Sequence, residues 1–85
     1  MKLYSVKDVK AASYFRPFPS VNDQVAIRDL KSLVNSKESE ISNYPEDYEL
    51  WYIGDFDEKI GTIVSDLKFL VNCQDLKEVK NDDIQ

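Results

Sequence analysis

Tyr48-Glu49-Leu50-Trp51-Tyr52-Ile53 is the stretch that decides the fold. It is rich in aromatic and branched residues, which favour a β-strand. Because the run shows little polar alternation, it predicts a central strand with both faces at least partly covered. Gly54 follows directly and indicates a bulge. We therefore expect residues 48–53 to form the middle of a sheet.

The chain after this strand predicts a hairpin. Residues 55–61 contain acids and a late glycine, and Gly61 suits a positive φ in the loop. Residues 62–64 are expected to pair back as the next strand, and residues 67–71 form a further short apolar run. From Leu76 onward the chain is mostly charged. We therefore predict one domain over 1–75 and a charged, frayed tail over 76–85.

The segment before the central strand predicts one amphipathic helix. Residues 20–23 offer a side-chain acceptor for the first free amides, so the helix should begin at about residue 21 and run for about four turns. Residues 36–43 are expected to be helix fray followed by a polar loop. Apolar residues recur at helical spacing at Val25, Ala26, Ile27, Leu30, Leu33 and Val34.

The amino-terminal part predicts further extended chain. Residues 3–9 read as a strand and residues 11–18 as a second extended segment, in which Pro17 and Pro19 favour an edge strand or a loop. The predicted fold class is α+β, with a small antiparallel β-sheet of three to five strands packed against one amphipathic helix. The edges of such a sheet make a homodimer plausible.

The composition excludes several classes of site. The 85 residues include no histidine, one cysteine and two glycines, so imidazole catalysis, an internal disulfide and a glycine-rich phosphate loop are absent. We expect no enzyme, no metal site and no cofactor, and we expect Cys73 to pack in the core. The chain has no apolar run of about 20 residues, which predicts no contact with a membrane. A cytoplasmic location is expected.

The amino-terminal third is basic and carries the candidates for nucleic-acid binding. Residues 1–31 have six basic and three acidic side chains. Cations that hold phosphates and aromatic faces that stack on bases are the usual means of binding single-stranded DNA. The alternative is that these aromatic residues, and likewise Tyr48, Trp51 and Tyr52, serve the core of a small domain. The candidate residues are Lys7, Lys10, Arg16, Tyr14 and Phe15.

The rest of the chain is acidic and carries the candidates for a protein contact. Residues 32–85 have five lysines and thirteen acidic side chains, which leaves a net charge of −5 for the whole chain. Such a balance opposes broad binding of nucleic acid. An acidic surface that persists as one patch would instead suit a basic protein partner. The candidate residues are Glu46, Asp47, Glu49, Asp55, Asp57 and Glu58.

Four segments, in this order and spacing, resemble the small nonstructural protein of gokushoviruses, a subfamily of the Microviridae bacteriophages. The resemblance covers about residues 1–64 and carries no catalytic motif. The matching segments are residues 4–11 (YSVKDVKA), residues 26–35 from the Ala-Ile-Arg-Asp-Leu run to Val-Asn, residues 44–50 (YPEDYEL), and residues 53–57 (IGDFD) with Gly61.

The resemblance implies a non-enzymatic accessory protein in the cytoplasm of the host bacterium. Its expected role lies in viral DNA replication or in the production and packaging of single-stranded DNA. Two mechanisms are open. The protein acts through contacts with viral replication or procapsid proteins or with host replication proteins, or it binds single-stranded DNA weakly through its basic, aromatic amino-terminal half.

Overall fold

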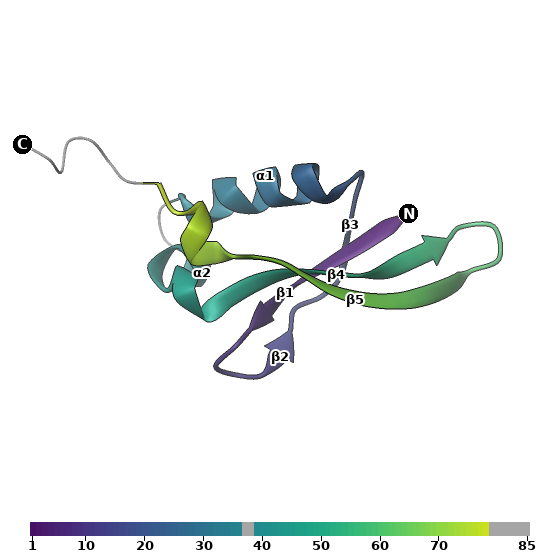
Figure 1. Cartoon of the computed structure of the whole chain (residues 1–85), viewed down its shortest axis with the longest axis horizontal. Coiled ribbons are helices and arrows are strands. Elements are labelled where there is room, and N and C mark those ends of the chain that lie inside the picture. Colours follow the sequence, from purple (N-terminus) through teal and green to yellow (C-terminus); the bar gives the residue numbers. More distant parts are fainter. Residues whose placement is uncertain (37–38, 79–85) are drawn as a thin grey trace, which may run out of the picture.

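The computed structural model describes residues 1–36 and 39–78. Figure 1 shows a twisted antiparallel sheet with one main helix lying across one of its faces, which is the predicted α+β class. The elements in chain order are β1 (Lys2–Asp8), β2 (Ser13–Tyr14), β3 (Phe18–Ser20), α1 (Asp23–Val34), α2 (Glu40–Asn43), the 3₁₀ turn η1 (Pro45–Asp47), β4 (Tyr48–Asp57), β5 (Thr62–Asn72) and the 3₁₀ turn η2 (Cys73–Leu76).

Strand β4 lies inside the sheet, as its sequence predicts. The strand order is β2-β1-β4-β5, and all pairs are antiparallel. The short strand β3 pairs with the other end of β1, along the same edge as β2. The two prolines of this part of the chain therefore stay at the margin of the sheet, where a missing backbone donor costs little.

Helix α1 packs on the sheet through one residue per turn. Ala26, Leu30 and Val34 are buried, whereas Leu33 on the predicted apolar face is 42% exposed. The helix begins at Asp23, later than predicted, because the Asn22 side chain caps it by accepting a hydrogen bond from the backbone N–H of Val25 at 2.9 Å. It is twelve residues long and ends at Val34.

The core lies between α1 and a single face of the sheet. Helix α1 covers only the face that carries Tyr4, Val6 and Leu50 (Figure 1). Successive residues of a strand point to opposite faces, and Glu49, Trp51 and Ile53 on the other face of β4 are half-buried. Both faces of β4 are therefore at least partly covered, as predicted, but the helix covers only one of them. The buried apolar residues are Tyr4, Val6, Ala26, Leu30, Val34, Ile41, Tyr48, Leu50, Cys73 and Leu76.

The polar segment after α1 is not only a loop. Residues 40–43 form the short helix α2, which buries Ile41 and Ser42. Ser39 and Ser42 cap it reciprocally, because each side-chain oxygen accepts a hydrogen bond from the other residue's backbone N–H, at 2.9 and 3.1 Å. The sequence hides this helix because serine replaces the glutamate or glutamine that usually marks such a reciprocal cap.

Strands β4 and β5 form a long hairpin that projects beyond α1 (Figure 1). Strand β5 is continuous over Thr62–Asn72, so the two separate runs predicted there are one element. Gly61 has a φ of 74° in the connecting turn, as predicted. We call the part of the hairpin beyond Gly54, residues 55–65, the distal arm.

Gly54 marks an irregularity in β4, at which the alternation of its side chains between the two sheet faces shifts by one residue. Tyr52 pairs with Tyr4 of β1, but Gly54 pairs with Leu3, so the pairing register shifts between them. Gly54 has a φ of 152°, and a Cβ atom at this position would lie 2.3 Å from the carbonyl oxygen of Val64. Only glycine fits both the backbone conformation and the space. The predicted bulge is therefore present.

The last described residues close the carboxyl end of α1. The Asn35 side chain donates to the Leu76 carbonyl at 2.9 Å and accepts from the Glu78 backbone N–H at 2.8 Å. The Lys77 ammonium donates to the carbonyls of Val34 and Ser42. Since Leu76 is also buried, the packed chain extends beyond the predicted boundary at residue 75. Residues 79–85 of the predicted tail lie outside the described residues.

Candidate nucleic-acid interface

The sheet face that α1 leaves uncovered brings side chains of four strands together. Trp51 of β4 pairs with Ser5 of β1 on one side and with Phe69 of β5 on the other. Lys7 of β1 pairs with Tyr14 of β2. Directly opposed residues in an antiparallel sheet lie on the same face. The uncovered face therefore carries aromatic rings from three of these four strands, β2, β4 and β5.

These rings form what we call the aromatic row, which consists of Tyr14, Trp51 and Phe69. The Tyr14 and Trp51 ring centroids are 6.0 Å apart, those of Trp51 and Phe69 are 5.7 Å apart, and both pairs meet edge to face. The Lys7 ammonium lies 5.5 Å from the Tyr14 ring centroid and 5.6 Å from that of Trp51. A cation thus sits between two rings of the row.

Short hydrogen bonds hold the row in place. The Trp51 indole N–H donates to a Glu49 carboxylate oxygen at 3.0 Å, which fixes the ring orientation. The Ser5 hydroxyl donates to the Phe15 carbonyl at 2.6 Å, and the Phe15 backbone N–H donates to the Val6 carbonyl at 2.7 Å. These bonds tie the segment that carries Tyr14 to β1. The rings are therefore positioned by the sheet, while Tyr14 and Phe69 remain 40% and 51% exposed.

The expectation that Trp51 serves the core is wrong. Tyr48 is buried and Tyr52 packs partly against the core, but Trp51 lies outside both sets and on the other face. The period-two alternation of a strand places Tyr48, Leu50 and Tyr52 together and puts Trp51 opposite them. That alternation is the signal in the sequence that separates Trp51 from its neighbours.

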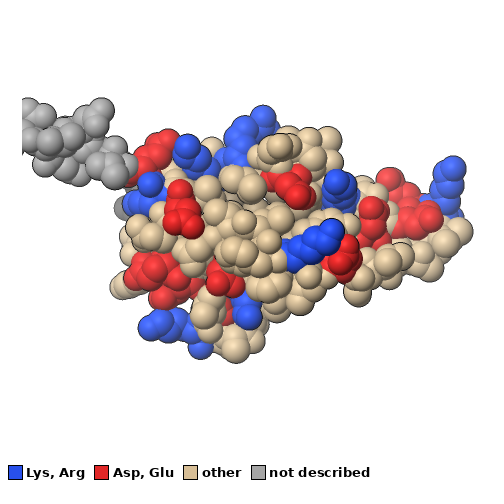
Figure 2. Space-filling view, in the orientation of Figure 1, with Lys and Arg blue, Asp and Glu red and all other residues tan. Residues whose placement is uncertain are grey.

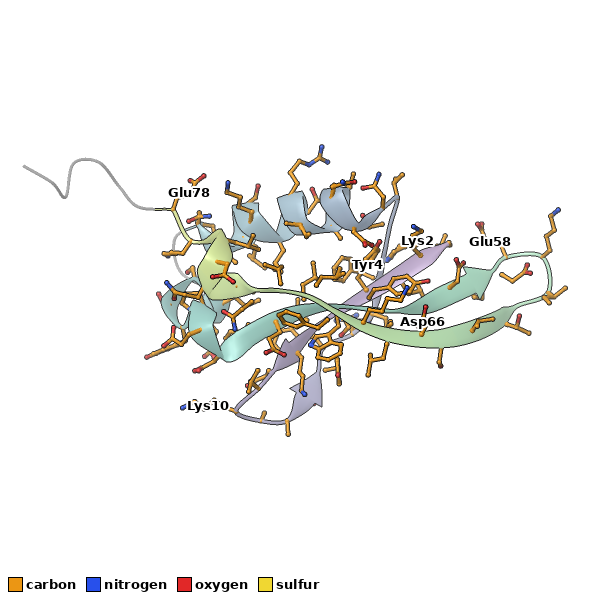
Figure 3. All side chains as sticks on the ribbon, viewed as in Figure 1. Lys2, Tyr4, Lys10, Glu58, Asp66 and Glu78 are labelled. Carbon is orange, nitrogen blue, oxygen red and sulfur yellow. The ribbon has the colours of Figure 1, made fainter. Side chains whose placement is uncertain are left out.

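The structure divides the residues predicted to bind nucleic acid. Lys7 and Tyr14 lie together on the uncovered face. Phe15 and Arg16 line a groove beside α1 instead, with the Phe15 ring 5.8 Å from the Tyr48 ring. Lys10 is exposed in the turn between β1 and β2, away from the body of the sheet (Figure 3). The predicted set is therefore not one site, and its core is Lys7 and Tyr14, joined by Trp51 and Phe69.

The predicted acidic surface also divides, and the expectation that it forms one patch is wrong. Glu46, Asp47 and Glu49 lie at the start of β4, whereas the other three acids lie on the distal arm. At about 3.3 Å per strand residue, Glu49 and Asp55, the nearest members of the two groups, lie about 20 Å apart along β4. Figure 2 shows acidic side chains gathered toward both ends of the molecule. The second group consists of Asp55, Asp57 and Glu58, of which Asp55 accepts from the Met1 amino group at 2.9 Å.

Every residue whose pKa is clearly shifted lies on the covered side. Burial raises the pKa of Tyr4, Tyr48 and Tyr52, and nearby carboxylates raise it further. Burial, with a smaller contribution from Glu49, raises the pKa of the Cys73 thiol to about 11. These shifts are what packing in a core produces. Within residues 1–36 and 39–78, no three histidine, cysteine or acidic side chains converge as metal ligands would.

A shallow hollow continues the uncovered face from the aromatic row toward the distal arm. It has a volume of about 400 Å³. Its walls are mainly apolar, and side chains of β1, β4 and β5 all contribute to it. The lining residues are Leu3, Ser5, Tyr14, Pro17, Ile53, Ile63, Ser65 and Leu67.

Comparison with known proteins places this chain in a phage family. No solved structure matches the chain. None of the helices in the described parts is long and apolar enough to span a membrane.

The chain is 40% identical over 65 residues to Protein ORF5 of Chlamydia phage 1, a gokushovirus, and the match covers 72% of this chain and 68% of that protein. The model of the Phage ORF5 protein family matches residues 1–76, which includes every strand and helix described above. The chain therefore belongs to the phage ORF5 protein family.

Proposed function

We propose that this protein is a non-enzymatic accessory factor in viral DNA replication or in the production and packaging of single-stranded DNA. It works in the cytoplasm of the host bacterium and binds single-stranded DNA through the aromatic row and Lys7. The observation that carries this proposal is the row of Tyr14, Trp51 and Phe69, with the Lys7 ammonium between the first two rings, on a sheet face that none of the described helices covers.

Aromatic rings on an uncovered sheet suit unpaired bases. Stacking of one base on an aromatic side chain contributes about 1–3 kcal/mol and depends little on base identity, because every base has a π face. Lys7 can hold a phosphate while the rings on either side of it hold bases. The expected ligand is therefore single-stranded DNA of mixed sequence rather than a duplex, whose bases are already stacked.

The charge of the chain sets the strength of this binding. The net charge is −5, and Glu49 lies beside Trp51, so the face gains little from long-range attraction. Each phosphate contact with a single strand contributes a slope of about −0.7 to the dependence of log K on log salt concentration. With Lys7 in the row and at most Lys10, on the turn between β1 and β2, as a second phosphate contact, we expect a slope between about −0.7 and −1.4. Stacking then supplies most of the affinity.

The test is fluorescence anisotropy of a labelled oligothymidylate titrated with protein at low and physiological salt. Trp51 is the only tryptophan, so quenching of the intrinsic emission reports contact at the row itself. We expect Trp51→Ala to weaken binding by about 5- to 150-fold, since it removes about 1–3 kcal/mol of stacking. Trp51→Phe should retain most of the affinity because a ring remains.

Two matched pairs of variants locate the contact. Phe69→Ala removes a ring of the row, whereas Phe15→Ala removes a ring of similar exposure beside α1. Lys7→Gln removes the cation of the row, whereas Lys59→Gln removes one on the hairpin turn. Only Phe69→Ala and Lys7→Gln should weaken binding. Equal effects within each pair, or no binding by the native protein at low salt, would exclude this face as the DNA site.

The expected contact with viral replication or procapsid proteins, or with host replication proteins, remains a separate prediction. The acids proposed for it lie at the two ends of β4, so each end needs its own test. Charge reversal of Glu46, Asp47 and Glu49 tests one end, and reversal of Asp57 and Glu58 tests the other. Viral DNA synthesis in infected cells is the readout for both.

A further inference from the structure

Strand β5 forms an outer edge of the sheet. It is the last strand in the order β2-β1-β4-β5, and in the described parts of the chain no strand pairs with its outward edge. Thr62 to Phe69 are all exposed, and the distal arm carries residues 62–65 of this stretch beyond α1 (Figure 1). An exposed edge of this length offers a row of free backbone donors and acceptors to another strand.

The sequence of this edge is complementary to itself. Leu67 is the central residue of β5, which spans Thr62–Asn72. If two copies of β5 run antiparallel about a two-fold axis at Leu67, Asp66 of each copy lies opposite Lys68 of the other. The same register places Val64 opposite Leu70 and Leu67 opposite its own copy. The alignment that uses the full length of the strand is thus also the one that pairs opposite charges.

We propose that two copies of this chain form a homodimer by antiparallel pairing of their β5 strands, centred on Leu67. Such an interface is isologous, because the same edge serves both copies. Opposite charges directly across two strands stabilise the pair, and like charges destabilise it. The symmetry gives each dimer two Asp66–Lys68 pairs between the copies.

The charged side chains are already arranged for this contact. Asp66 and Lys68 lie on the same side of β5, with 3.3 Å between the Lys68 ammonium and an Asp66 carboxylate oxygen. The Lys68 ammonium also lies 5.7 Å from the Tyr52 ring centroid, on the covered side. Figure 3 shows Asp66 on β5, below α1 in this view and past the end of that helix. A second copy can therefore approach the edge without displacing α1.

The ladder between β4 and β5 is irregular at two places. Its register shifts beyond Phe69, where Leu50 pairs with Val71 but Trp51 pairs with Phe69, and again next to Leu67, where Tyr52 pairs with Lys68 but Gly54 pairs with Ser65. Leu67 lies within this second irregularity, so we expect intermolecular backbone hydrogen bonds on its two sides, within residues 64–70. The uncovered faces of the two copies would then become one continuous surface. This dimer uses the strand edge rather than the aromatic row, so its failure would leave the proposed DNA contact untouched, and the reverse also holds.

The decisive experiment exchanges the two charges between copies. Asp66→Lys alone sets four lysines across the interface, and Lys68→Asp alone sets four aspartates. Each variant should dissociate about tenfold or more readily than the native dimer in sedimentation velocity. An equimolar mixture of the two variants should form heterodimers, because each cross-strand pair then joins a lysine of one variant to an aspartate of the other. The ion pair between residues 66 and 68 of one chain is absent from both variants, so its restoration cannot explain why the mixture dimerises.

A second measurement locates the axis. In a Cys73→Ala background, Leu67→Cys should form a disulfide with its own copy under mild oxidation, whereas Ile60→Cys on the hairpin turn should not. A native protein that sediments as a monomer over the accessible concentration range would overturn the proposal. A mixture of the two charge variants that stays monomeric would overturn the register, and with it the interface proposed here.

Discussion

The two faces of the sheet use the same strands for different purposes. The covered face carries Tyr4, Val6 and Leu50, each almost completely buried against α1. The uncovered face carries Lys7 and Trp51 on the same two strands and Phe69 on the neighbouring β5, and the Phe69 ring is 51% exposed. Large aromatic residues occur on both faces, so residue type does not separate core from binding surface in this protein. The position of each residue relative to the single helix does.

The largest effect should come from truncating a leucine on the covered face. Leu50 is fully buried, so Leu50→Ala should lower the free energy of unfolding by about 3 kcal/mol through lost burial and the cavity left behind. The matched change is Leu67→Ala, at a residue that is 56% exposed. Urea denaturation at a concentration where the protein is monomeric should show a change below about 0.5 kcal/mol for Leu67→Ala. Similar losses for the two variants would erase the distinction between the faces.

The next effect concerns Gly54, at which the side-chain alternation of β4 shifts by one residue. Gly54→Ala should lower the free energy of unfolding by about 2 kcal/mol, because the new methyl group meets the Val64 carbonyl in a backbone conformation unsuited to alanine. Gly61→Ala is the control, since its Cβ would meet nothing within 4 Å. It should cost only about 1 kcal/mol, for its positive φ. Thermal unfolding of the two variants side by side tests the difference.

A smaller effect tests how the covered face holds the helix. The Tyr4 hydroxyl donates to an Asp23 carboxylate oxygen at 2.6 Å, which joins β1 to the first turn of α1. Tyr4→Phe should therefore lower the free energy of unfolding by about 1 kcal/mol. Tyr14→Phe removes a hydroxyl from the uncovered face and should leave stability unchanged in the same urea titration. A loss for Tyr14→Phe as large as that for Tyr4→Phe would show that both faces stabilise the fold alike.

The smallest effect is a dependence on pH. The pKa of Cys73 is raised from 9.0 to about 11 in the folded chain, so the folded state retains the proton longer than the unfolded state. This contribution to stability is complete below pH 9 and is lost as the pH rises toward 11. At pH 9.5 the loss should be about 0.8 kcal/mol relative to pH 7. Over the same pH interval, Cys73→Ala should therefore lose about 0.8 kcal/mol less stability than the native protein. Identical pH profiles for the two proteins would show that other groups cause the loss.

The sequence predicts which helices and strands form better than it predicts the residues at which they begin and end. The run of large residues at 48–53 identifies the central strand, and the apolar spacing from Val25 to Val34 identifies the helix. The helix start is misplaced because Ser20 and Asn22 both have suitable capping side chains, and only the backbone shows which one is used. Helix α2 escapes prediction because its cap is built from two serines.

The candidate site is only half predictable, for a physical reason. Lys7 and Tyr14 are close in sequence, and pairing between neighbouring strands brings them together. Phe69 reaches Trp51 only through the long hairpin and its register shifts, which local patterns do not encode. The acids from Glu46 to Glu58 are close in sequence and yet lie far apart, because β4 is extended. Sequence distance is a poor guide to surface distance along a strand.

The bonds that close the carboxyl end of α1 have a consequence for how the chain is made. The Asn35 side chain bonds to residues 76 and 78 as well as to the Lys31 carbonyl, and a ribosome adds residues 76 and 78 only after all five strands have been synthesised. The helix that covers the sheet therefore emerges long before the bonds that join its carboxyl end to η2 can form, and until then local bonds from Asn35 and Ser36 alone close its last turn. A chain whose translation stops within β5 would lack that connection. The host's proteases would then meet a nascent protein whose main helix is held less firmly on the sheet.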